Sequence, residues 1–140
     1  MNCTVCQKGV LEVANSRKHD KESRVWRRRR CSACQTVFTT YETIDYDRTF
    51  SISKDTKQPM RQFSKSLLLA QLFASGGHLQ DQSALFYLSE TIARKAFLKA
   101  CEDNMKISSK EYHRIILETL TAYDKLLGAT FDARFPSDNH

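Results

Sequence analysis

Long hydrophobic runs are missing from this chain of 140 residues. The longest apolar-rich stretch, residues 67–74, is interrupted by Gln71, and it is far shorter than the roughly 20 residues that cross a bilayer as a helix. No stretch has the pattern of a signal peptide. We therefore expect no membrane association and a cytoplasmic location, where reducing conditions leave cysteine thiols free to bind a metal.

Motifs of catalysis and of phosphate binding are also missing. The sequence has no P-loop, no G-x-G-x-x-G and no H-E-x-x-H. Its four histidines are scattered, and no set of nucleophile, base and acid stands out. We expect that the protein is not an enzyme.

The cysteines, by contrast, form two closely spaced pairs. Cys3 and Cys6 make one C-x-x-C, Cys31 and Cys34 make a second, and 24 residues separate the pairs. Two such turns can present four thiolates in the tetrahedral arrangement that zinc prefers in structural sites. Two disulfides or four unrelated core cysteines are the alternatives. The segment has too few apolar residues for a core of its own, which favours a metal staple with one zinc ion per chain.

Positive charge is concentrated near the cysteines. Residues 1–40 hold nine Lys or Arg and three Asp or Glu, so their balance of +6 equals the net charge of the whole chain. The run Arg27–Arg30 contributes most. On a strand, Arg27 and Arg29 would face one way and Arg28 and Arg30 the other. The pattern is typical of a nucleic-acid-binding module; a solvated, solubilising face is the alternative.

Residues 1–46 predict a zinc ribbon with three short strands. We expect strands over residues 10–13, 24–30 and 36–44, with the polar residues 15–23 as a hairpin connection. Phe38 is expected to pack beneath the metal site, and the polar residues 45–48 mark the domain junction.

Residues 47–136 predict a β-hairpin followed by three or four helices, so the fold class is α+β. Residues 50–53 and 60–62 form the expected hairpin. Helices are expected from a Ser64 cap to Gly76, from Asp81 or Ser83 to about Glu102, from the capping box at Ser108 and Glu111 to Gly128, and over 129–135. We expect Leu67, Leu68, Leu72, Phe73 and Cys101 in the core, and a disordered tail over 137–140.

These features combine as in a known family. The chain carries Ser16-Arg17, then Arg27–Arg30 directly before the second C-x-x-C, then F-T-T-Y-E at 38–42. The combination resembles the NrdR family, bacterial transcriptional repressors of ribonucleotide reductase genes. The resemblance implies a cytoplasmic, nucleoid-associated regulator that binds double-stranded DNA at paired operator sites. The residues expected to contact DNA are Arg17, Lys18, Arg27, Arg28, Arg29 and Arg30.

In that family the second domain is an ATP-cone, in which bound ATP or dATP sets the state of a homo-oligomer. The resemblance therefore implies a nucleotide-binding domain over residues 47–136. The candidate ligands of a triphosphate are Lys54, Lys57, Arg61, Lys65 and His113. Thr56 and Leu67 stand where the family has Gly and Lys. The alternative is therefore a ribbon that binds protein or nucleic acid, joined to a degenerate cone that serves only oligomerisation.

Overall fold

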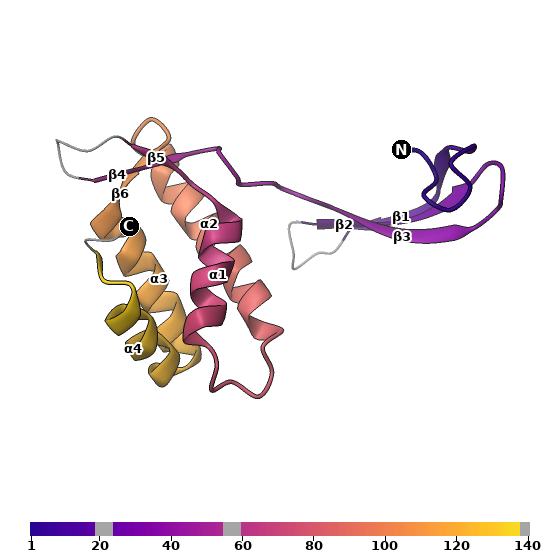
Figure 1. Cartoon of the computed structure of the whole chain (residues 1–140). Coiled ribbons are helices and arrows are strands. Elements are labelled where there is room, and N and C mark those ends of the chain that lie inside the picture. The colour runs from indigo at the N-terminus through magenta and orange to yellow at the C-terminus, as the bar shows by residue number, and fades with distance from the viewer. Residues whose placement is uncertain (19–23, 55–59, 138–140) are drawn as a thin grey trace. The chain divides into compact units, whose positions relative to one another are not determined.

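The computed structural model describes residues 1–18, 24–54 and 60–137 (Figure 1). The chain divides into two compact units, Met1–Asp45 and Tyr46–His140. The first holds an antiparallel sheet, and the second holds a small mixed sheet with four helices. The predicted α+β class is confirmed. None of the helices in the described ranges is long and apolar enough to span a membrane.

Three strands in the order β1-β2-β3 form the sheet of the N-terminal unit. They are β1 (Leu11–Lys18), β2 (Arg24–Cys31) and β3 (Val37–Thr43), with a bulge between Val13 and Asn15. We expected a hairpin connection from residue 15, which is wrong. The strand continues to Lys18, because the polar residues of β1 still pair with the backbone of β2: Asn15 lies opposite Arg28, and Arg17 opposite Trp26.

The core of this unit is very small. It consists of Cys3, Leu11 and Cys31, with Cys6 and Phe38 packed against them. Phe38 thus lies against the cysteines as expected. Of the apolar residues near the start of β1, it is Leu11 that is buried, whereas Val10 and Val13 are exposed. So few apolar contacts cannot hold a domain of this size together without a staple.

A second sheet, with strand order β5-β4-β6, opens the C-terminal unit. Strand β4 (Ser51–Ser53) pairs antiparallel with β5 (Arg61–Gln62), which confirms the predicted hairpin. It also pairs in parallel with β6 (Lys106–Ser108), a strand that we did not predict. Residues 55–59, including the candidate ligand Lys57, lie outside the described residues.

Three of the four helices described in this unit begin at side-chain caps. They are α1 (Lys65–Ser75), α2 (Ala84–Cys101), α3 (Ser109–Tyr123) and α4 (Lys125–Arg134). Ser64 Oγ accepts a hydrogen bond from the Leu67 N–H at 3.4 Å, and Ser108 Oγ accepts one from the Glu111 N–H at 3.2 Å. These two predicted N-caps are therefore confirmed. The predicted cap of α2 is wrong, because Ser83 precedes the helix without a side-chain hydrogen bond to it.

The expected end of the third helix at Gly128 is wrong. Asp124 interrupts the helix and caps α4 instead, its carboxylate accepting the Leu127 N–H at 2.6 Å. Gly128 consequently lies inside α4, where an added Cβ would stand 2.3 Å from Thr121 Oγ1. The glycine permits a close crossing of α3 and α4 rather than ending a helix.

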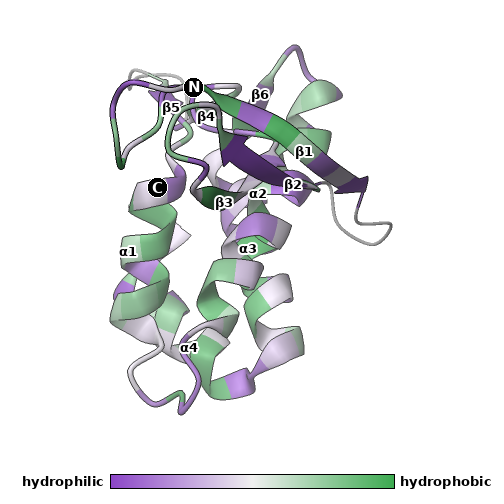
Figure 2. Cartoon of the chain, turned by 90° about the vertical axis from the view of Figure 1, so that its right-hand side faces the viewer, coloured by the Kyte–Doolittle hydropathy of each residue, from purple (hydrophilic) through white to green (hydrophobic). Residues whose placement is uncertain are grey.

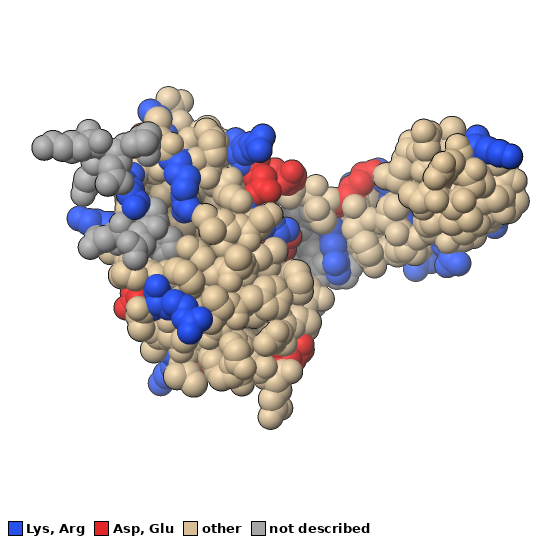
Figure 3. All heavy atoms as spheres, in the orientation of Figure 1, with Lys and Arg blue, Asp and Glu red and all other residues tan. Residues whose placement is uncertain are grey.

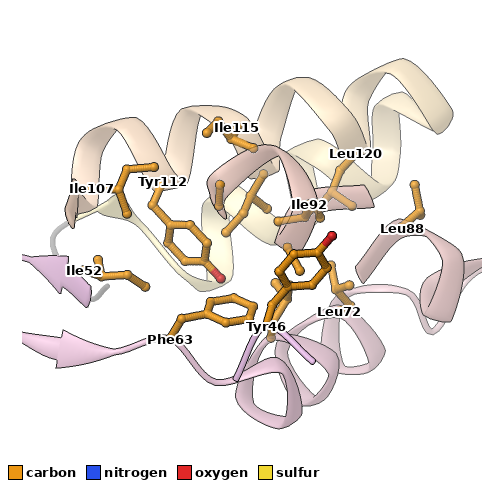
Figure 4. Close-up of a cluster of buried hydrophobic side chains, with 14 of the residues drawn as sticks. Tyr46, Ile52, Phe63, Leu72, Leu88, Ile92, Ile107, Tyr112, Ile115 and Leu120 are labelled. Carbon is orange, nitrogen blue, oxygen red and sulfur yellow. The ribbon is translucent and has the colours of Figure 1, made fainter. Parts of the chain in front are cut away.

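Aromatic rings from residues next to strands β4 and β5 and from α3 meet in the core (Figure 4). Phe63 stacks on Phe50 at a centroid distance of 4.6 Å and meets the edge of Tyr112 at 6.2 Å. Two predicted core residues are wrong. Leu67 is 40 % exposed, and Cys101 is exposed while its neighbour Ala100 is buried. Of the predicted disordered tail, residues 138–140 lie outside the described residues.

Candidate metal centre and nucleic-acid interface

The two C-x-x-C segments fold into matching turns. In the first, the Gln7 N–H donates to the Cys3 carbonyl at 3.0 Å, and in the second the Gln35 N–H donates to the Cys31 carbonyl at 3.1 Å. The glutamine that follows each pair is in the left-handed region, with φ of 55° at Gln7 and 62° at Gln35. Each turn therefore ends in the same way, with both sulfurs of the pair on one side of the backbone.

The four sulfurs come together as one cluster. All four Sγ atoms of Cys3, Cys6, Cys31 and Cys34 lie within 4.8 Å of one another. Cys3 Sγ is 3.7 Å from Cys34 Sγ, and Cys6 Sγ is 3.6 Å from Cys31 Sγ. Tetrahedral zinc, with zinc–sulfur bonds of about 2.3 Å, requires sulfurs about 3.8 Å apart. The Cys3–Cys34 and Cys6–Cys31 distances are close to this spacing, and every cysteine in the cluster is a free thiol.

Hydrogen bonds prepare individual sulfurs to carry negative charge. The hydroxyl and N–H of Thr36 favour the Cys34 thiolate and lower the pKa of Cys34 to about 6. The N–H groups of Lys8 and Gly9 lower the pKa of Cys6. The N–H of Cys34 acts in the same direction on Cys31, but burial and the neighbouring thiols outweigh it and raise the pKa of Cys31 to about 11. A cation at the centre would stabilise all four thiolates at once.

Gly9 allows the two turns to approach. A Cβ at this position would stand 2.5 Å from Cys31 Sγ and 2.8 Å from the backbone N of Ala33. We expect Gly9→Ala to displace the second turn and to weaken zinc binding at least about 10-fold, since overpacking costs about 1–3 kcal/mol and each 1.4 kcal/mol is a factor of ten. Competition with a chromophoric chelator measures this affinity.

Gly77→Ala is the matched control, because a Cβ there has nothing within 4 Å. It should leave zinc affinity unchanged. An affinity for zinc that is equal in Gly9→Ala and in the unmodified protein would contradict the geometry described for the two turns.

Strand pairing divides the arginine run between the two faces of the sheet. Strand β2 is among the most hydrophilic segments of the chain (Figure 2). As predicted, Arg27 and Arg29 share one face, and Arg28 and Arg30 share the other. A few Lys and Arg side chains are visible on the surface of this unit in Figure 3.

The Glu42 face carries Ser16, Lys18, Arg27, Arg29, Thr40 and Glu42, and its two arginines are paired within the face. Nη2 of Arg27 lies 2.8 Å from Oε2 of Glu42, and its Nε lies 2.7 Å from Oε1. Nη2 of Arg29 reaches the same Oε1 at 3.4 Å, and its Nε donates to Thr40 Oγ1 at 3.0 Å. Both faces of the sheet carry arginines, but on this face one carboxylate is shared by two guanidinium groups.

The Trp26 face carries Arg17, Arg24, Trp26, Arg28, Arg30 and Tyr41. Arg28 and Arg30 are exposed, and no carboxylate in the described parts of the chain forms an ion pair with either. The Arg17 guanidinium lies 5.9 Å from the Trp26 ring centre, and that of Arg24 lies 5.1 Å from the Tyr41 ring centre. The aromatic rings thus support two further cations beside the exposed pair.

The candidate nucleotide ligands lie on different elements of the C-terminal unit and differ in their contacts. Lys65, at the start of α1, is paired with Glu90 of α2. His113 is buried on α3, with Nε2 2.9 Å from Asp132 Oδ1 of α4. Lys54 follows β4, and Arg61 lies in β5 opposite Ile52. Arg61 Nε is buried and has no hydrogen-bond partner among the described residues.

A hollow on the surface of the C-terminal unit lies elsewhere. It is shallow and open, and the residues that line it belong to α4: Ala129, Thr130, Ala133 and Arg134. None of the candidate nucleotide ligands contributes to it. The structure therefore brings the four cysteines together in one cluster. It does not place the predicted nucleotide ligands around a cavity formed by the described residues.

Comparison with known proteins shows what the N-terminal unit is similar to. The family model described as "Transcriptional repressor NrdR-like, N-terminal domain" matches residues 1–42. Residues 1–42 are similar to the zinc ribbon of NrdR-like repressors. The predicted resemblance to the NrdR family is confirmed, and this range contains all four cysteines, the arginine run and Glu42.

The NrdR similarity extends beyond the ribbon. A transcriptional repressor NrdR of Chlamydia pneumoniae is 28% identical over 127 residues, which cover 90% of this chain and 80% of the relative. The same description applies to a protein of Burkholderia cenocepacia, 37% identical over 73 residues, or 50% of this chain and 46% of the relative. A Chlamydia felis repressor NrdR is also 28% identical over 127 residues. These relatives are regulators of transcription rather than enzymes.

Two residues of the ribbon were not singled out from the sequence. Arg24 joins the Trp26 face through Tyr41, and Glu42 pairs with Arg27 and Arg29. Glu42 was visible only as part of a motif. The signal that could have identified its role is strand pairing, which places Glu42 opposite Val25 and diagonal to Arg27.

Proposed function

We propose that this protein is a zinc-dependent transcriptional repressor that binds double-stranded DNA near bacterial ribonucleotide reductase genes. The observation that carries the proposal is a four-sulfur centre fixing a sheet whose exposed arginines all lie on one face. Similarity to repressors of the NrdR family supports the assignment to transcription. The protein would act in the bacterial cytoplasm, on the nucleoid.

The Trp26 face is the proposed DNA-contacting surface. Arg28 and Arg30 are exposed and free to bind phosphates, and a guanidinium can also read a guanine edge through two hydrogen bonds. Arg17 and Arg24, held against aromatic rings, would extend the basic strip on either side. Of the residues expected to contact DNA, Lys18, Arg27 and Arg29 lie on the opposite face of the sheet, as the strand pairing shows.

One ribbon is too small to discriminate a site tightly. Specific protein–DNA interfaces bury about 1,000–2,500 Å² of protein surface, and single small modules bury less. We therefore propose that a homo-oligomer presents two ribbons to paired operator sites.

Nucleotide control is the second part of the proposal. Arg61 supports it, since its buried Nε has no partner among the described residues and would be satisfied by a phosphate oxygen. Lys54 lies on the adjoining strand end. ATP or dATP bound beside this sheet would then favour the oligomeric state that binds paired operator sites on DNA.

A specific observation favours the rival function. Lys65 and His113 already have carboxylate partners within the unit, Glu90 and Asp132. Two of the candidate ligands are therefore occupied, and the C-terminal unit would serve as an assembly module without nucleotide.

Native mass spectrometry and DNA titration together test both readings. The unmodified protein is titrated with a duplex from the promoter of ribonucleotide reductase genes and with a scrambled duplex, with and without ATP or dATP. We expect one zinc per chain, preferential binding of the promoter duplex and a change of oligomer with nucleotide. Promoter binding with no bound nucleotide would favour the assembly module, and equal weak binding of both duplexes would overturn the repressor proposal.

A further inference from the structure

We propose that Glu42 is a positioning residue that closes one face of the ribbon to DNA, so that the duplex is met only by the Trp26 face. This inference rests on the proposed DNA-binding function and concerns how the ribbon achieves specificity. It predicts that the four consecutive arginines are not equivalent. Two of them bind DNA, and the other two are held by an internal counter-ion.

Glu42 forms ion pairs with both arginines on its face. Its Oε2 accepts a hydrogen bond from Arg27 Nη2 at 2.8 Å, and its Oε1 forms ion pairs with Arg27 Nε at 2.7 Å and with Arg29 Nη2 at 3.4 Å. Thr40 and Ser16 complete the set, with Thr40 Oγ1 3.0 Å from Arg29 Nε and Ser16 Oγ 3.4 Å from Arg27 Nη1. Both arginines of this face are thus held by side chains of the ribbon itself, through ion pairs with Glu42 and hydrogen bonds to Glu42, Thr40 and Ser16.

Burial makes this pairing hard for DNA to displace. The Arg27 side chain is only 28% exposed and that of Arg29 only 16%, whereas Glu42 is 50% exposed. A phosphate approaching this face therefore meets the carboxylate before it meets a guanidinium. The hydrogen bond from Arg27 lowers the pKa of Glu42, so the carboxylate remains charged near neutral pH and repels a phosphate.

Specificity follows from this asymmetry. A thin sheet with two equally basic faces could lie on a duplex in two opposite orientations, of which only one can present a given set of side chains to the bases. A like charge placed against the wrong partner is a standard way to suppress incorrect binding. Glu42 places such a charge on one face and leaves the Trp26 face open.

The decisive variant is Glu42→Gln, which keeps the shape of the side chain but removes its charge. Freed Arg27 and Arg29 would add phosphate contacts, and each contact steepens the slope of log affinity against log salt by about 0.9. We expect a slope steeper by about 1–2, affinity for a scrambled duplex raised about 10-fold or more, and a smaller preference for the promoter duplex. Fluorescence anisotropy over a series of salt concentrations measures all three.

Three further variants separate this role from a structural one. Glu42→Asp keeps the charge and should keep most of the slope and preference of the unmodified ribbon. Glu12→Gln removes one negative charge from the opposite face, where Glu12 lies across from Arg30. It should steepen the slope of log affinity against log salt by less than about 0.9, the value for one phosphate contact. Arg27→Gln with Arg29→Gln, added to Glu42→Gln, should return the slope to its original value.

The outcomes are distinct. A slope and a promoter preference that are unchanged in zinc-loaded Glu42→Gln overturn the inference. If Glu42→Gln fails to hold zinc, Arg27→Gln with Arg29→Gln in the otherwise unmodified chain decides: a slope that is unchanged supports the inference, and a slope that falls by about two contacts overturns it. Failure of the unmodified protein to bind any duplex would instead reject the proposed function itself.

Discussion

Removing the metal is expected to abolish DNA binding and to unfold the N-terminal unit while the helical unit stays folded. Among the described residues of the ribbon, the buried apolar core contains only Cys3, Leu11 and Cys31. Burial of an apolar side chain contributes about 1.5–3 kcal/mol, whereas ordering each residue costs about 1–2 kcal/mol in backbone entropy. Structural zinc contributes about 10–16 kcal/mol, so the metal decides whether the ribbon folds.

The helical unit has no such dependence. Its core contains many fully buried side chains, Phe50, Ile92, Ile116 and Leu120 among them, and no cluster of metal-binding groups was found in its described residues. We therefore expect a chelator under reducing conditions to remove the sheet signal and DNA binding but to preserve the helical circular dichroism and its thermal transition.

Cys31→Ser provides the same test without a chelator, and Cys101→Ser is its matched control. Cys31 is fully buried in the sulfur cluster, whereas Cys101 is exposed at the end of α2. Only Cys31→Ser should lose zinc and DNA binding. A chelated or Cys31→Ser protein that still binds the promoter duplex would show that zinc is not the staple of the DNA-binding unit.

The double replacement Arg28→Gln with Arg30→Gln is expected to reduce affinity for the promoter duplex about 100-fold or more, since each good bidentate arginine contact is worth about 1–3 kcal/mol. Both side chains are exposed on the Trp26 face, and they pair across β2 and β3 with Thr39 and Val37. Neither residue belongs to the core or to the sulfur cluster, so zinc content should not change. Fluorescence anisotropy measures the affinity.

The matched control is Arg27→Gln with Arg29→Gln, which makes the same change in charge and composition one residue away. Because Glu42 already occupies these arginines, we expect less than about a fivefold loss of affinity, equivalent to under one ordinary contact. Equal losses in the two double variants would refute the assignment of DNA binding to one face.

Local patterns in the sequence predicted much of the ribbon. The spacing of the cysteines is sufficient to suggest the sulfur cluster, and period-two alternation is sufficient to separate Arg27 from Arg28. The extent of β1 was underestimated at Asn15, because polar residues are ambiguous between a turn and an exposed strand. Only the pairing with β2 resolves that ambiguity, and the pairing is not local in sequence.

In the helical unit, too, features that depend on neighbouring residues were predicted, and features that depend on distant residues were missed. Caps at Ser64 and Ser108 were predictable because a cap depends on neighbouring residues only. Strand β6 was missed because three residues carry no periodic pattern and its partner β4 is more than 50 residues away in the chain. Cys101 was placed in the core because the apolar pattern of α2 allows a shift of one residue; Ala100 takes the buried position instead.

The pairing of Glu42 with two arginines could not be predicted for a related reason. The three residues come from two strands, and their contact depends on the register of β2 against β3. A shift of one residue would place Glu42 on the Trp26 face beside Arg28 and reverse the roles of the arginines. The functional difference between the two faces is therefore a property of the folded sheet.

The most direct test of the central claim uses Trp26, the only tryptophan in the chain. It lies on the proposed DNA-contacting face, with Arg17 over its ring. Its emission and its quenching by acrylamide are recorded while promoter duplex is added to the zinc-loaded protein. The account predicts that bound DNA alters the emission and shields Trp26 from acrylamide. Duplex that binds, as anisotropy of the labelled DNA shows, while Trp26 remains unchanged and equally accessible would contradict it.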